Sequence, residues 1–132
     1  MPATILRAAF PKRLRILVNE SETEAVNCEE AVAAMLYVPV GFAAADIVPL
    51  AAWGDNDYEP AAEMRPSPPG YQVVQDESGV ALTITGVVPG RWHAVPEKAL
   101  RGKYLKFRSA SVGTVNATAQ PAQQDLVLVM KS

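Results

Sequence analysis

Short apolar runs alternate with proline and glycine along the whole chain, which has eleven prolines and eight glycines in 132 residues. The runs are four to seven residues long, a length typical of strands and short for most helices. They lie at 14–18, 37–40, 46–50, 71–75, 80–85, 103–109 and 125–130. Several short strands at this spacing predict an antiparallel β-sandwich or jelly roll.

Three of these regions predict more than a strand. Asp76–Gly79 separates two runs and predicts a hairpin turn, with Gly79 where a positive φ is needed. Residues 125–130 are almost uninterruptedly apolar and predict a central, buried strand. Residues 103–109 alternate instead, which predicts two unlike faces. One face would carry Lys103, Leu105 and Phe107, and the other Tyr104, Lys106 and Arg108.

Residues 23–36 are ambiguous. Their glutamates and alanines favour helix by propensity, whereas residues 23–26 and 32–38 can each form a strand. We expect strands, because Pro39 and the downstream pattern are typical of β-structure. A helical turn at 29–34 is the open alternative.

Residues 53–70 are rich in proline, glycine and aspartate and have no strand pattern. Loops of this length in compact domains are usually functional or flexible. The side chains expected to project from this loop are Trp53, Asp55, Asp57 and Tyr58. We expect a single domain over residues 1–132, with an extended basic arm at 1–12 and a long proline-rich loop at 54–70.

Composition narrows the class of protein. Hydrophobic residues make up 49% of the chain, but 21 are alanine, 16 are valine, and aromatic residues are only 7%. Because alanine buries little area, the core is lean, which favours a thin two-layer sandwich or a subunit stabilised by partners. No apolar run approaches the roughly 20 residues of a membrane span, so we expect no membrane association.

Charge is segregated although the net charge is only −2. Residues 1–19 carry +4, residues 20–90 carry −11 and residues 91–132 carry +5, which sum to −2. Segregated charge gives faces of opposite sign, which serve association with other molecules.

The candidate chemistry is sparse. The single Cys28 excludes an internal disulfide and a multi-cysteine zinc site, and neighbouring glutamates raise the pKa of a thiol. The single His93 has no second imidazole for a relay, and we expect its strand to place Trp92 in the core and His93 at the surface. The acidic loop at Asp55 has Pro60 where a calcium loop needs glycine. We therefore expect no enzyme, no catalytic residues, no metal and no cofactor.

The basic side chains are the candidate partner-binding residues. They are Arg7, Lys12, Arg13 and Arg15 near the N-terminus, and Lys98, Arg101, Lys103, Lys106 and Arg108 further along. Because the chain is acidic overall, a protein with an acidic surface is favoured over nucleic acid.

From about Glu24 to the end, the order of features resembles a family of small virion proteins of tailed bacteriophages. The matching segments are Tyr37–Pro39, Ala45–Ile47, Gly54–Asn56, Tyr71–Val74, Asp76–Gly79, Val95–Pro96, Gly102–Ser109, Gln120 and Leu126–Val129. Their order and spacing carry the resemblance, since no single motif is specific. The proline-rich 59–70 insertion and the basic arm depart from the family pattern.

The resemblance implies a capsid cement or decoration protein: an all-β, jelly-roll-like antiparallel β-sandwich with a basic N-terminal arm. The implied partner is the major capsid protein, on the exterior of a virion assembled in the host cytoplasm. We also expect self-association as a dimer or other small oligomer. The alternative is a carbohydrate-binding jelly-roll module on a virion or tail, with Trp53, Tyr58 and the Asp55/Asp57 loop as its platform.

Overall fold

The computed structural model describes residues 9–52 and 71–132, with side chains from residue 11 onward. Eight strands lie in these ranges: β1 (Ala9–Ile16), β2 (Val26–Asn27), β3 (Ala33–Val38), β4 (Asp46–Ala52), β5 (Gln72–Val73), β6 (Arg91–Ala94), β7 (Tyr104–Ala110) and β8 (Gln124–Lys131). The one helical element of the described residues is a short 3₁₀ helix, η4 (Glu97–Arg101).

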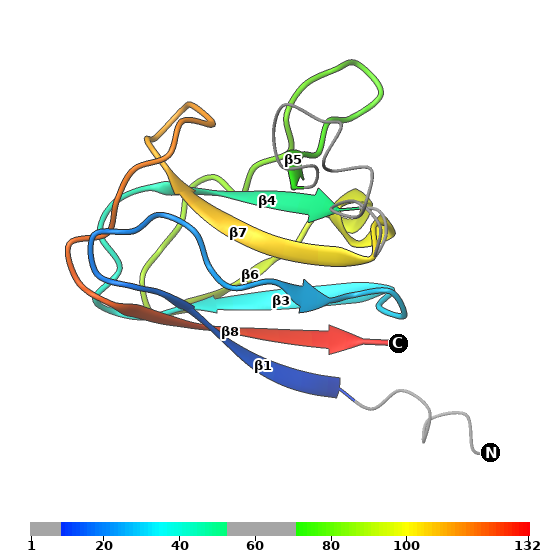
Figure 1. Cartoon of the computed structure of the whole chain (residues 1–132), viewed down its shortest axis with the longest axis horizontal. Coiled ribbons are helices and arrows are strands. Elements are labelled where there is room, and N and C mark those ends of the chain that lie inside the picture. Colours follow the sequence, from blue (N-terminus) through cyan, green and yellow to red (C-terminus); the bar gives the residue numbers. More distant parts are fainter. Residues whose placement is uncertain (1–8, 53–70) are drawn as a thin grey trace, which may run out of the picture.

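The strands form two four-stranded antiparallel sheets that face each other (Figure 1). Sheet A has the order β1-β8-β3-β6, and sheet B has the order β2-β7-β4-β5. Each strand of the first half pairs with one of the second half: β1 with β8, β2 with β7, β3 with β6 and β4 with β5. The predicted all-β antiparallel sandwich is confirmed.

The core lies between the sheets, where alternate residues of each strand point inward. Leu36 and Val38 of β3, Leu126 and Leu128 of β8, and Leu105 and Phe107 of β7 are fully buried. The two unlike faces predicted for residues 103–109 are confirmed, since the side chains of Tyr104, Lys106 and Arg108 are only half-buried on the other side.

The prediction for β8 is half right. β8 is central in sheet A, between β1 and β3, but its burial alternates. Val127 and Val129 are half-buried, because the outer face of sheet A is open. The strand buried on both faces is β4, whose outer residues Val48 and Leu50 form a second small core with Ala110.

The N-terminal arm is shorter than predicted, because β1 begins at Ala9 rather than near Leu14. Residues 9–12 pair with residues 128–131 of β8, and backbone pairing of this kind needs no apolar side chains. Pro11 is tolerated because β1 is an edge strand. The backbone N–H of Arg15 points to the free edge and donates to Glu24 Oε1 at 2.9 Å, so alternation places the nitrogen of Pro11 on that edge too.

The hairpin around Gly79 is confirmed as a turn but not as a pair of strands. Gly79 has φ 81°, and the Asp76 carboxylate accepts the N–H groups of Ser78 and Val80. The expected strand at 80–85 is wrong. This segment makes one isolated bridge beside the turn and a second at Ile84 to β4, so it changes partner before a ladder can form.

Residues 23–36 form strands, as expected, rather than a helix. Between β2 and β3 the chain makes a single turn, closed by the hydrogen bond from the Ala31 N–H to the Cys28 carbonyl at 3.0 Å. Propensity is overridden here because β2 and β3 gain backbone partners in two different sheets.

Candidate functional site

The outer face of sheet A carries the largest exposed aromatic side chain of the described residues. Trp92, on edge strand β6, is 47% exposed, so its predicted place in the core is wrong. Its register partner on β3 is Tyr37, and the ring centroids lie 5.3 Å apart at 58°. The alternation of β6 predicts only that Trp92 and His93 lie on opposite faces. Pairing decides which face is inner, because His93 stands opposite the buried Leu36.

Strand register extends this aromatic pair into two rows that cross the whole of sheet A. The first row is Arg13, Val127, Tyr37 and Trp92, and the second is Pro11, Val129, Met35 and Ala94. We call these eight residues the apolar face. It contains no acidic side chain, and its one cation, Arg13, lies at the β1 margin. Contiguous apolar surface with aromatic and arginine side chains is typical of protein interfaces.

The outer face of sheet B is occupied by contacts within the chain. The Glu22 carboxylate lies 2.8 Å from Lys106 Nζ and 3.1 Å from Arg108 NH2. Lys106 also lies over the ring of Tyr71, at 4.6 Å from its centroid. Burial alone would raise the pKa of Glu22, but these two cations outweigh burial and lower it. Lys106 and Arg108, predicted to bind a partner, therefore share one carboxylate within the protein.

The other predicted basic residues are spread over several parts of the surface. Lys98, on η4, forms an ion pair with Glu77, and Arg101 is exposed on the same element. Lys103 lies beside the Tyr104 ring, at 5.9 Å from its centroid. Arg15 pairs loosely with Glu24, at 3.8 Å. These residues form no single basic patch, because the β-sandwich places them on different sheets and ends.

Three exposed cations lie on the paired strands β1 and β8: Arg13 and Lys131 on the outer face of sheet A, and Lys12, opposite the buried Leu128, on its inner face. Lys12, Arg13 and Lys131 make no ion pair with any described residue. We call this group the basic margin. Lys131 was missed from the sequence, because only the β1–β8 pairing brings the last strand beside the first.

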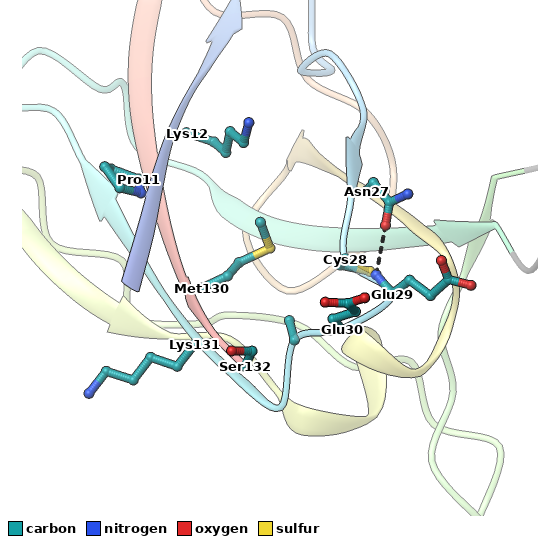
Figure 2. A pocket seen from close by; sticks show the side chains of 10 residues that line it. Pro11, Lys12, Asn27, Cys28, Glu29, Glu30, Met130, Lys131 and Ser132 are labelled. Carbon is teal, nitrogen blue, oxygen red and sulfur yellow. Dashed lines mark hydrogen bonds between the residues drawn. The ribbon is translucent and has the colours of Figure 1, made fainter. Parts of the chain in front are cut away.

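A pocket of about 490 Å³ opens beside the basic margin, between the ends of β1 and β8 and the turn after β2 (Figure 2). Lys12 and Lys131 lie on one side of it, and Glu29 and Glu30 lie on the other. Asn27 Oδ1 accepts the Glu29 N–H at 2.9 Å, which fixes that acidic turn. Met130 points between the two sides.

Cys28 lines this pocket but is not an activated nucleophile. Its side chain is buried and its thiol donates to the Gly102 carbonyl at 3.4 Å. Burial, together with the nearby charge of Glu29, raises the pKa of the thiol to about 11. Since the thiolate is the reactive form, Cys28 has little nucleophilic character near neutral pH.

Within residues 9–52 and 71–132, no group of three or more His, Cys, Asp or Glu side chains is placed to hold a metal ion. No helix in this part of the chain is long and apolar enough to cross a membrane.

Some predicted site residues lie outside the described residues: Arg7, Trp53, Asp55, Asp57 and Tyr58. The carbohydrate-binding alternative rests on the last four and stays a prediction. A glycan array with and without calcium tests it, and no binding under either condition would end it.

Comparison of the chain with protein-family models, with curated proteins and with solved structures gave no match.

Proposed function

We propose that this chain is a non-enzymatic structural protein of a phage virion: a cement or decoration protein on the capsid exterior that stabilises contacts between major capsid subunits. The pairing of first-half with second-half strands supports a jelly-roll topology, the fold that the family resemblance implies. A protein of this kind needs adhesive surfaces, and the sandwich offers two.

The observation that carries the proposal is the basic margin. Lys12, Arg13 and Lys131 are exposed on adjacent strands and have no ion-pair partner among the described residues. Uncompensated charge of one sign attracts a surface of the opposite sign and sets the orientation of docking. The margin therefore fits an acidic surface on the capsid.

Repetition strengthens such a contact. A capsid presents the same acidic surface many times, so a protein that touches two subunits binds the second at high effective concentration. Weak ion pairs at each site then suffice to hold neighbouring subunits together.

The test is co-sedimentation of the purified protein with heads assembled from the major capsid protein of the same genome. We expect binding at about 50 mM salt that falls at least tenfold at about 500 mM, because salt screens exposed charge. Lys12→Glu combined with Lys131→Glu should weaken binding at low salt. Arg91→Glu with Arg101→Glu makes the same charge change away from the margin and should bind nearly as the wild type does.

Two results would contradict the proposal. One is no co-sedimentation at low salt. The other is an equal loss of binding in both double variants, which would show that net charge, rather than the basic margin, determines binding.

A further inference from the structure

The two sheets differ in what covers their outer faces. On sheet B, the outer residues Val48 and Leu50 are buried under Tyr71, Val73 and Val115 of the same chain. On sheet A, Trp92 is 47% exposed and Met35 is 41% exposed, with the half-buried Val127 and Val129 between β1 and β3. The apolar face is thus one side of a sandwich layer that the described chain leaves uncovered.

We infer that this face packs against the same face of a second copy, around a two-fold axis parallel to the strands. The inference goes beyond the proposed function: it places Arg13 in the contact between two copies and leaves Lys12 and Lys131 of the basic margin for the capsid. It depends on the order of residues in the two rows.

The first row is self-complementary under this axis. The axis places β1 of one copy over β6 of the other, so Arg13 meets the partner's Trp92 and Val127 meets the partner's Tyr37. A guanidinium over an indole ring is a favourable pairing, and it becomes stronger when water is removed. In the second row, Val129 meets the partner's Met35 in the same way.

A two-fold axis perpendicular to the strands could also pack the two apolar faces together, but charge favours the parallel axis. With the parallel axis, the two Arg13 side chains lie at opposite margins. Three strand spacings of about 4.8 Å and a sheet separation of about 10 Å put them roughly 17 Å apart, beyond the screening length of about 8 Å. A perpendicular axis would place β1 over the partner's β1 and gather Lys12, Arg13 and Arg15 of both copies at one edge.

The contact area sets the expected strength. The two rows span about four residues along each strand, so four strands at about 4.8 Å spacing give a flat face of roughly 250 Å². A standard stable interface buries about 800 Å² per partner. We therefore expect a reversible dimer with a dissociation constant in the micromolar range.

The experiment is sedimentation velocity of the full chain without capsid protein, from about 1 to 500 µM. We expect a monomer–dimer equilibrium. Val127→Glu should raise the dissociation constant at least about 100-fold, since it buries a charge in the contact. Met35→Glu, at a more exposed position, is the second variant if Val127→Glu folds poorly. Val112→Glu, at a 69% exposed valine in the β7–β8 loop, should change the constant less than about twofold.

A double-mutant cycle between Arg13 and Trp92 tests the direction of the two-fold axis. Arg13→Ala and Trp92→Ala should each weaken the dimer about tenfold, and the double variant should lose much less than the product, because the two side chains meet across the interface. An Arg13→Ala variant that dimerises more tightly would overturn the parallel axis. A wild type that stays monomeric at 500 µM while binding heads would overturn the inference and leave the proposed function standing. A protein that dimerises but does not bind heads would support this inference and contradict the proposed function.

Discussion

At the residue scale, Gln120 is the side chain that joins distant parts of the chain through buried hydrogen bonds. It is fully buried, accepts the Ala43 N–H at 2.9 Å and donates to Ser109 Oγ at 2.8 Å. Through these bonds Gln120, in the loop before β8, connects to β7 and to the loop before β4. Buried polar groups are costly when unpaired, so Gln120 acts as a structural tie rather than a surface residue.

Replacing Gln120→Leu keeps the volume and removes the hydrogen bonds. We expect the free energy of unfolding to fall by about 2–4 kcal/mol, because the buried Ser109 loses a bond worth about 1–3 kcal/mol and the half-buried Ala43 loses one worth about 1 kcal/mol. Urea denaturation measures it. Gln123→Leu changes the same residue type at an exposed position and should shift stability by less than about 0.5 kcal/mol. Similar losses in both variants would contradict the role of Gln120.

At the element scale, β7 shows what alternation predicts and what it leaves undetermined. Its inner face of Leu105 and Phe107 follows from the pattern of the sequence. Its outer cations were predicted to meet a partner protein, but they meet Glu22, which is 84 residues from Lys106. The isolated bridge between Glu22 and Arg108 brings these groups together, and that bridge exists only in the folded sandwich.

The Glu22 cluster makes stability depend on pH. Because the pKa of Glu22 is lower in the folded protein than its ordinary 4.5, its contribution is full above about pH 5 and is lost as the pH falls through the lower folded value. Between about pH 5 and pH 3 the wild type should therefore lose more stability than Glu22→Gln. Thermal melts across this range measure the difference.

Glu20→Gln is the matched control, since Glu20 makes no ion pair with a described residue. This variant should keep the wild-type pH dependence. The turn carboxylates Asp76 and Glu77 also have lowered pKa values and remain in every variant, so they cancel in the comparison. Equal slopes for Glu22→Gln and the wild type would show that the cluster does not stabilise the fold.

At the scale of the whole molecule, the two sheets enclose one lean core and Cys28 reports whether they stay closed. Its side chain is only 1% exposed, between the end of β2 and Gly102. Gly102 itself has no room for a side chain, since an added Cβ would lie 2.8 Å from the Ala52 carbonyl oxygen. Close approach of backbones here seals the thiol within the sandwich.

Labelling of Cys28 with a thiol reagent at pH 8 should therefore be slow in the native protein. Raising the pKa from 9.0 to about 11 lowers the thiolate fraction about 100-fold, and burial slows the reaction further. The rate should rise with urea in parallel with unfolding measured by circular dichroism. Fast labelling of the folded protein would mean that the structure opens locally at the pocket that Cys28 lines, between β1 and the turn after β2.

The sequence by itself determined the all-β class, the turn at Gly79 and the two faces of β7, because turn geometry and alternation are local properties. It left open which face of β6 is inner, since period two separates Trp92 from His93 without naming the core side. Only the tertiary structure decided that Trp92 is exposed, that β1 reaches back to Ala9, and that β8, which carries Lys131, pairs with β1, which carries Lys12. Those outcomes depend on pairing between strands far apart in the chain, and pairing is set by the packing of the two sheets together.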